Sequence, residues 1–160
     1  MTGIMQAVMN NVAVTYPPYT WYEAFGTTVA ISTTQYVYGT KIYAYSSTYD
    51  VPSYQNAVIQ VNDVEIVNTA QRGHTMAVLA ANGSTVSITN YDTYGNPSAV
   101  TAMTNALNAV ATGNRVVLVV YDASALDAAA RSAINNGYGS TNTNTWTPQR
   151  ISHIFVGIKS

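Results

Sequence analysis

The chain of 160 residues contains no cysteine, which excludes a disulfide and a zinc site built from thiolates. No apolar run approaches the roughly 20 residues that a helix needs to span a bilayer. The N-terminal stretch lacks a basic region, and Asn10 and Asn11 interrupt its apolar part, so it is a poor match to a signal peptide. The 6 basic residues are scattered, with no basic stripe that could neutralise a phosphate backbone. We therefore expect neither a membrane nor a nucleic acid as partner.

Charge is scarce. Only 8 % of the residues are charged, and the net charge is −1, whereas about 25 % is usual in globular domains. Hydrophobic residues make up 48 %, enough for one domain with a buried core. The surface must therefore be covered mostly by Ser, Thr, Asn, Gln and Tyr. Such a surface suits packing into an assembly, although a weakly charged soluble domain without that role would have the same composition.

The N-terminal segment combines proline with aromatic residues and shows no sustained helix or strand period. Pro17 and Pro18 favour extended backbone. We expect residues 1–26 to form an arm, which either folds over the core or contacts a partner, and residues 27–160 to form the globular domain. Because aromatic side chains anchor protein contacts, the expected contact residues of the arm are Tyr16, Pro17, Pro18, Tyr19, Trp21 and Tyr22.

Alternating β-branched and aromatic residues predict strands over much of residues 27–90. A turn is expected at Asn62–Asp63. Asn82–Gly83 lies between two β-rich runs and predicts a hairpin with a type I′ turn, which needs a positive φ at both positions.

Helices alternate with strands in the rest of the chain. Asn96 is expected to cap a helix whose first turn contains Pro97. One face of this helix carries Val100, Met103, Leu107 and Val110. The run RVVLVVYD predicts a strand buried on both faces. A second helix is expected between Ser124, as its N-cap, and Gly137, as its stop, with Leu126, Ala130, Ala133 and Ile134 facing inward. The run RISHIFVGI predicts a final strand.

Five segments occur in an order and spacing that match a known pattern. They are an Arg-Gly before a hydrophobic strand (QRGHTMAVLAANG), a Tyr-Asp-x-Tyr before a helix (NYDTYGNPSAVTAMTNAL), a strand ending in Tyr-Asp (TGNRVVLVVYDASA), a helix (LDAAARSAINNGYGS) and a closing strand (SHIFVGIKS). From about Val58, the chain resembles the interleukin-like EMT inducer (ILEI) domain. The resemblance implies an α+β or α/β fold, a sandwich of two small, mostly antiparallel sheets with two short helices.

The chain also departs from that family. Secreted animal members carry disulfide cysteines and a Gly-Gly-Arg-Gly entry, where this chain has TAQRG, so a secreted signalling role ranks low. Similar domains occur in virion proteins of bacteriophages, which this weakly charged chain resembles. The resemblance thus implies a structural component of a tailed-phage virion, in the tail, neck or an appendage. Its expected location is the virion, and its expected partners are other virion subunits or further copies of itself.

The chemistry expected of this chain is not catalytic. The motifs HExxH, GxSxG, GxGxxG and the Walker loop are absent. His74 and His153 each fall in a predicted strand and could pair to hold a metal, but neither His-x-His spacing nor a nearby acid cluster supports this. We expect half-buried structural histidines, and no enzyme activity, cofactor or metal. A triad of Asp122, Ser124 and a histidine is disfavoured, because Ser124 is better explained as a helix cap.

Glycan binding is the alternative function. The resemblance includes the stem domain of a protein O-mannose N-acetylglucosaminyltransferase, which binds glycans. An aromatic face and planar polar groups could converge at one loop end, from Tyr91, Asp92, Tyr94, Asn96, Asn144 and Trp146. The competing interpretation is structural, because Asp92 can accept backbone N–H bonds where a strand gives way to a loop. Arg72 could also pair with such an acid.

Overall fold

The computed structural model describes residues 13–14, 21–26, 28–33, 40–49, 55–141, 143 and 150–160, with the backbone alone for 13–14 and 28–33. Along these residues the elements are β1 (Ala13–Val14), β2 (Trp21–Gly26), β3 (Thr28–Thr33), β4 (Ile42–Thr48), β5 (Ala57–Val61), β6 (Val64–Thr69), β7 (Gly73–Leu79), β8 (Thr85–Tyr91), α1 (Pro97–Ala109), β9 (Arg115–Asp122), α2 (Ala128–Tyr138) and β10 (Ser152–Ile158). Neither helix within these ranges has the length and apolar character to cross a membrane.

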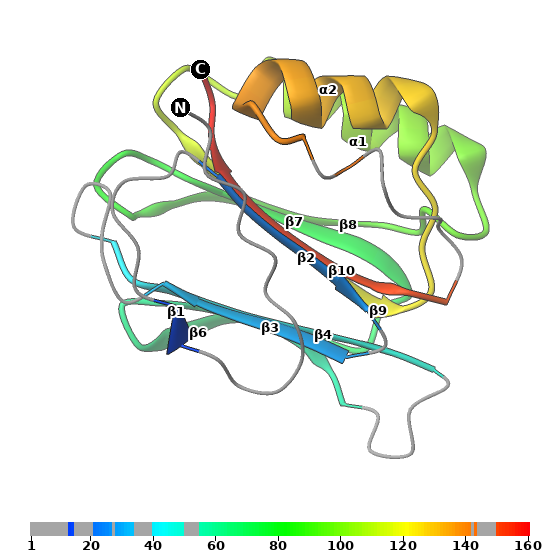
Figure 1. Cartoon of the computed structure of the whole chain (residues 1–160), viewed down its shortest axis with the longest axis horizontal. Coiled ribbons are helices and arrows are strands. Elements are labelled where there is room, and N and C mark those ends of the chain that lie inside the picture. The colour runs from blue at the N-terminus through cyan, green and yellow to red at the C-terminus, as the bar shows by residue number, and fades with distance from the viewer. Residues whose placement is uncertain are drawn as a thin grey trace.

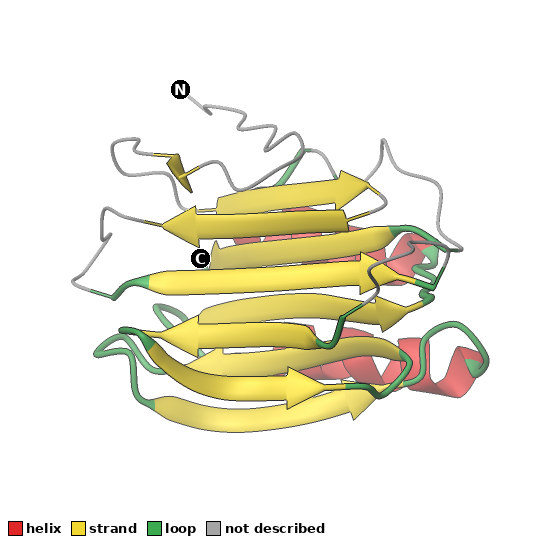
Figure 2. Ribbon diagram, turned by 90° about the horizontal axis from the view of Figure 1, so that it is seen from below, coloured by secondary structure: helices red, strands yellow, loops and turns green. Residues whose placement is uncertain are grey.

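The ten described strands form one continuous mixed sheet. One half has the order β8-β7-β9-β10-β2, and the other has the order β1-β3-β4-β5-β6. The halves join where β4 runs parallel to β9, at the pairs Ser47↔Tyr121 and Thr48↔Asp122. The sheet turns over at this corner, so its halves lie face to face (Figure 1). Figure 2 shows the strands side by side with both helices behind them.

This architecture corrects the expected fold class. The fold is a β-rich sandwich made by one mixed sheet, and the prediction of an α+β or α/β fold with two separate sheets was wrong. The reason is the parallel pairing of β4 with β9, which joins segments far apart in the sequence. Strand patterns report local burial but not which distant strand supplies the hydrogen bonds. The two short helices were predicted correctly.

Two hydrophobic cores hold the layers together. The core between the sheet halves includes Ala44, Ile59, Leu79, Val117, Val119 and Ile154. The core between the helices and the half that contains β7 to β10 includes Met76, Met103, Leu107, Leu118, Ile134 and Phe155. Strand β9 contributes alternate residues to both cores, and Val116 to Val120 are fully buried. The predicted strand with two buried faces is therefore confirmed.

The start of α1 is as predicted, but both ends of α2 differ. The Asn96 side chain accepts a hydrogen bond from the Ser98 N–H at 3.0 Å, and Pro97 is the first helical residue. In α2 the cap is Asp127, not Ser124, because Asp127 Oδ1 accepts from the Ala130 N–H at 2.8 Å. The helix also continues through Gly137 and ends at Gly139, whose φ of 79° is left-handed. A left-handed glycine closes a helix better than a glycine within it. The inward faces of both helices are confirmed. The predicted inward residues Val100, Met103, Leu107, Leu126, Ala130, Ala133 and Ile134 are buried, and Val110 packs against the same core.

Both predicted turns exist, but the two consecutive positive φ angles expected at Asn82–Gly83 occur at Asn62–Asp63 instead. Asn62 and Asp63 both have positive φ, at 51° and 65°, in the two-residue connection between β5 and β6. That is the pattern expected for Asn82–Gly83, where only Gly83 has a positive φ, at 85°. The β7–β8 hairpin is instead closed by a longer loop, in which Ala80 N–H donates to the Ser84 carbonyl at 2.8 Å.

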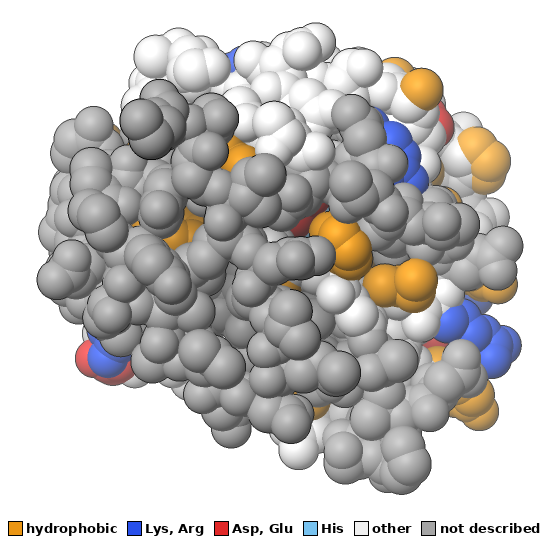
Figure 3. All heavy atoms as spheres, in the orientation of Figure 1, with side chains coloured by type: hydrophobic (Ala, Val, Ile, Leu, Met, Phe, Trp, Pro, Cys, Tyr) orange, Lys and Arg blue, Asp and Glu red, His pale blue; other side chains and the backbone are white. Residues whose placement is uncertain are grey.

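Figure 3 shows one face of the molecule. The charged side chains in view are few, and no extended patch of one sign appears among the coloured residues.

Candidate functional site

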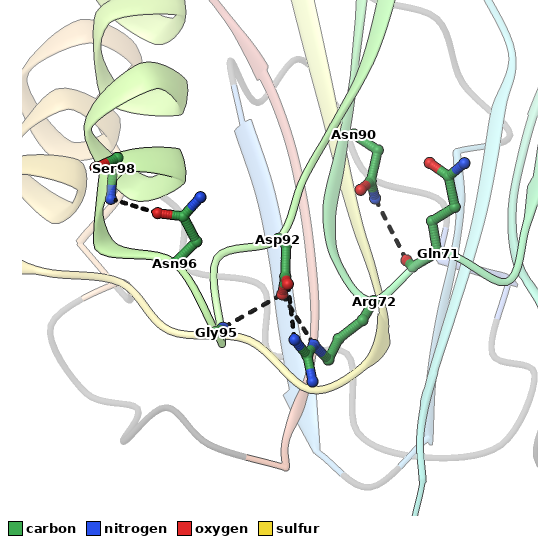
Figure 4. A network of polar contacts seen from close by, with 7 residues as sticks. All are labelled: Gln71, Arg72, Asn90, Asp92, Gly95, Asn96 and Ser98. Atoms are coloured by element: carbon green, nitrogen blue, oxygen red, sulfur yellow. Dashed lines mark hydrogen bonds and ion pairs between the residues drawn. The ribbon is translucent and has the colours of Figure 1, made fainter.

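Arg72 and Asp92 form a bidentate pair at one end of the β7–β8 hairpin (Figure 4). Arg72 precedes β7 and Asp92 follows β8, and the antiparallel pairing of these strands brings both to the same end. Arg72 Nε and Nη2 donate to the two Asp92 carboxylate oxygens at 2.9 and 2.7 Å. Hydrogen bonding to Arg72 lowers the pKa of Asp92, and the same bond raises the pKa of Arg72. Both side chains are about two-fifths exposed, at 43 % and 41 %, so solvent weakens their attraction.

Two glycines allow the backbone to approach this pair closely. A Cβ at Gly73 would lie 2.1 Å from the Tyr91 carbonyl oxygen, and Gly73 has a φ of +98°. A Cβ at Gly95 would lie 2.5 Å from Nη2 of Arg72. The Gly95 N–H itself donates to Asp92 Oδ1 at 3.2 Å. The pair is thus part of the chain's own loop structure, as the competing interpretation of Asp92 expects.

The other residues expected at a glycan site are only partly together. Tyr94 is 44 % exposed, and the Arg72 guanidinium carbon lies 5.5 Å from the centre of its ring. Tyr91 is half-buried against the core beneath the helices. The side-chain oxygen of Asn96 is used to cap α1. Asn144 and Trp146 lie outside the described residues.

A hollow of about 240 Å³, which we call the Tyr94 hollow, lies between the start of α1 and the segment before α2. It is lined by Thr93, Tyr94, Pro97, Val100, Ala125, Leu126 and Asp127. Most of these side chains are apolar, and one Asp127 oxygen already caps α2. The hollow is slightly smaller than the roughly 300 Å³ at which small-molecule pockets usually begin. Its chemistry suits an apolar group beside an aromatic ring better than a ring of hydroxyls.

A buried chain of polar side chains runs from this hollow into the core. His74 Nδ1 lies 2.8 Å from Thr93 Oγ1, and His74 Nε2 lies 3.0 Å from His153 Nδ1. His153 Nε2 lies 3.6 Å from Glu23 Oε2. Both histidines are fully buried and Glu23 is 1 % exposed. We call Thr93, His74, His153 and Glu23 the histidine chain. The expectation of half-buried histidines was wrong, because both rings point into the protein rather than across its surface.

The donors and acceptors of the histidine chain form one consistent order. Burial, together with His153, holds the pKa of His74 well below its ordinary value of 6.5, so the ring is neutral. We assign the Thr93 hydroxyl as donor to His74 Nδ1, and His74 Nε2–H as donor to His153 Nδ1. The remaining His153 N–H then faces the Glu23 carboxylate. That carboxylate also accepts from the Thr143 hydroxyl at 2.9 Å.

The histidine chain links β2, β7 and β10 with the segments that carry Thr93 and Thr143. Its members lie in a line, so Glu23 approaches the His153 nitrogen that points away from His74. Three ligands of one metal would instead converge on a point. Within the described ranges, no group of three or more His, Asp or Glu side chains could hold a metal ion. Buried and hydrogen-bonded in this way, the chain is suited to fixing strand positions rather than to meeting a substrate.

Comparison with known proteins gives one family match. The model of the interleukin-like EMT inducer domain matches residues 72–160, which is more than half of the chain. The chain belongs to the ILEI family. No curated protein matches it. The ILEI match begins at Arg72, and the first two motif segments of the resemblance contact each other through the Arg72–Asp92 pair and through Gly73 against Tyr91.

The residues expected to form an arm lie outside the ILEI match and are divided. Tyr16, Pro17, Pro18 and Tyr19 lie outside the described residues. Trp21 and Tyr22 belong to β2, which pairs with β10 in the sheet. They are 3 % and 7 % exposed, with Trp21 in the core beneath the helices and Tyr22 in the core between the sheet halves. In this structure Trp21 and Tyr22 are therefore core residues of the chain itself and not contacts offered to a partner.

Sequence reasoning missed Glu23. It lies in an aromatic and Pro-rich segment that showed no strand period, so nothing placed it beside a histidine more than a hundred positions away. One available signal was its isolation, because Glu23 is the only charged residue before Lys41. A lone carboxylate in an apolar strand needs buried partners. Those partners are His153, Ser140 and Thr143.

Proposed function

We propose that this ILEI protein is a non-enzymatic structural subunit that acts through protein–protein contacts, as a component of a tailed-phage virion in the tail, neck or an appendage. The observation that carries the proposal is the distribution of charge. From Gly73 to Asn114 the only Asp, Glu, Lys or Arg is Asp92, and Arg72 pairs with it. This stretch forms β7, β8 and α1.

A surface of this kind favours packing against other subunits. It has no net field to repel a neighbour, and charged residues are depleted at the centres of interfaces. Val86 and Ile88 of β8 are 57 % and 43 % exposed. The similarity of the weakly charged composition to that of virion proteins supports the choice of a virion over other assemblies. The remaining proposed contacts of the N-terminal segment are Tyr16, Pro17, Pro18 and Tyr19.

The proposal predicts that the protein is found in purified phage particles at a fixed copy number per particle. We expect the double variant Tyr16→Ala and Tyr19→Ala to fold, as judged by circular dichroism, and to be incorporated at least about tenfold less efficiently, because aromatic anchors carry much of the energy of such contacts. Quantitative mass spectrometry of purified particles measures the copy number of the natural protein and the incorporation of the double variant. The control is Tyr49→Ala, which removes an exposed tyrosine elsewhere. Absence of the protein from mature particles would overturn the proposed function.

Glycan binding is a second candidate, favoured by one observation, the exposure of Tyr94 beside the partly exposed Arg72–Asp92 pair. Sugar rings stack on such faces. If this is the function, a glycan array probed with the purified protein shows binding that Tyr94→Ala abolishes and Tyr49→Ala leaves unchanged. An array without any bound glycan at high protein concentration removes this candidate.

A further inference from the structure

Strand β8 is an edge of the sheet. Within the described part of the chain it pairs with β7 alone, while its other side carries backbone N–H and C=O groups directed away from the sheet. Its pairing with β7 keeps a regular register from Ser87 to Tyr91. An edge of 7 residues with free backbone groups is a template for another strand.

From Ser87 to Tyr91 this edge lacks the usual protection against pairing. Proteins normally place a charge, a proline or a bulge on an exposed edge strand. The sequence of β8 is TVSITNY, with neither charge nor proline. Its one irregularity is at Val86, where the register shifts opposite Val78 and Leu79, and the pairing is regular from Ser87 onward. The other edge strands of the two halves differ from it. Strand β6 carries Glu65 and begins next to Asp63, which is ion-paired with Lys41, β2 carries Glu23, and β1 has only 2 residues. The difference singles out β8 as the edge open to pairing.

We propose that a second copy of this chain pairs with it along β8, antiparallel, about a two-fold axis at Ile88. In this register Ile88 faces Ile88 and Ser87 faces Thr89, all within the regularly paired part of β8. Cross-strand pairs of β-branched residues stabilise antiparallel sheets. The sheet halves of the two copies then continue into one another, and the axis closes the assembly as a dimer.

The nature of the surface favours a copy of the same chain over a different partner. Two identical surfaces meet at the axis, so a charged residue near it would be repelled by the same residue of the second copy. Strands β7 and β8 and helix α1 contain no Asp, Glu, Lys or Arg, so this repulsion does not arise. A charged partner would find no complementary group there. Beside the edge lies a hollow of about 370 Å³ between α1 and the β7–β8 hairpin, whose apolar lining includes Met76, Val78, Val86, Ala106 and Val110. In the dimer the two hollows share one face of the joined sheet, which adds apolar surface beside the strand contact.

The decisive variant is Ile88→Lys. Ile88 is 43 % exposed, so the monomer tolerates lysine, whereas two lysines would meet at the axis. We expect light scattering during size-exclusion chromatography to show that the natural protein is a dimer. The dissociation constant of the dimer is expected to be at least about tenfold higher for Ile88→Lys. The matched control, Val64→Lys, places the same charge on β6 at a site 62 % exposed and leaves the dimer intact.

A second measurement needs no variant. Hydrogen exchange of the β8 amides is expected to slow as protein concentration rises, while exchange in β6 is unchanged. A natural protein that is monomeric at about 100 µM overturns the inference, and so does a dimer that Ile88→Lys does not weaken. This inference rests on the proposed function and names a partner for it. Different outcomes would overturn the β8 dimer and the proposed function. A monomer that still enters particles overturns the β8 contact alone, whereas absence from particles overturns the function whatever the oligomeric state.

Discussion

Replacing Gly73 with alanine is expected to lower the free energy of unfolding by about 3 kcal/mol or more. The new Cβ would lie 2.1 Å from the Tyr91 carbonyl oxygen and 2.8 Å from Asp92 Cα, both of them backbone atoms that cannot rotate away. To relieve the contact, the entry to β7 must separate from the end of β8. The φ of +98° adds strain for any residue with a side chain. Urea unfolding monitored by circular dichroism measures the loss.

The matched control for this prediction is Gly113→Ala. Gly113 has a similar φ of +86°, but nothing lies within 4 Å of its Cβ position. We expect only the cost of a left-handed alanine, about 1 kcal/mol. The difference between the two variants isolates the close approach of Gly73 to Tyr91. Equal losses would mean that the contact has no energetic weight, and that the Arg-Gly motif needs another explanation.

Local patterns in the sequence predicted those parts of the fold whose causes are local. Asn96 followed by Pro97 marks the start of α1, because a cap and a proline act on the nearest turn. The continuous apolar run of β9 predicted a strand buried on both faces, and each face of β9 does pack in a core. Ser124 was predicted as the cap of α2, but Ser124 is buried and Asp127 accepts the hydrogen bond from the Ala130 N–H instead.

The parts that could not be predicted depend on distant partners. Nothing near Ser47 indicates that it pairs with Tyr121, and this pairing makes one sheet out of two halves. The Arg72–Asp92 pair was anticipated only as a possible bridge between Arg72 and some acid, because the hairpin register that brings the two together follows from its turn. The histidine chain was out of reach, since it required β2 to be recognised as a strand beside β10.

The histidine chain makes the fold sensitive to acid. In the unfolded chain His74 binds a proton near its ordinary pKa of 6.5, whereas the lowered pKa in the folded protein keeps it neutral. Below that pH the unfolded state binds more protons, so stability falls as pH falls; above it both states are neutral and His74 contributes no pH dependence. We expect the free energy of unfolding to decrease by about 1.4 kcal/mol per pH unit on acidification from pH 6.5 until the lowered pKa is reached. Urea unfolding at a series of pH values measures this slope.

Two variants assign the slope to its source. His74→Asn removes the titrating ring and is expected to flatten the dependence on pH just below about pH 6.5, at a cost of about 1–3 kcal/mol at neutral pH because buried partners lose hydrogen bonds. Asp92→Asn should leave this range unchanged. The pKa of Asp92 lies below its ordinary 3.8 in the folded protein, so its contribution is present above that value and is lost only as pH falls further. A natural protein whose stability stays flat on acidification below pH 6.5 would show that His74 takes up a proton in the folded protein as readily as in the unfolded chain, and the neutral assignment of His74 would then be wrong.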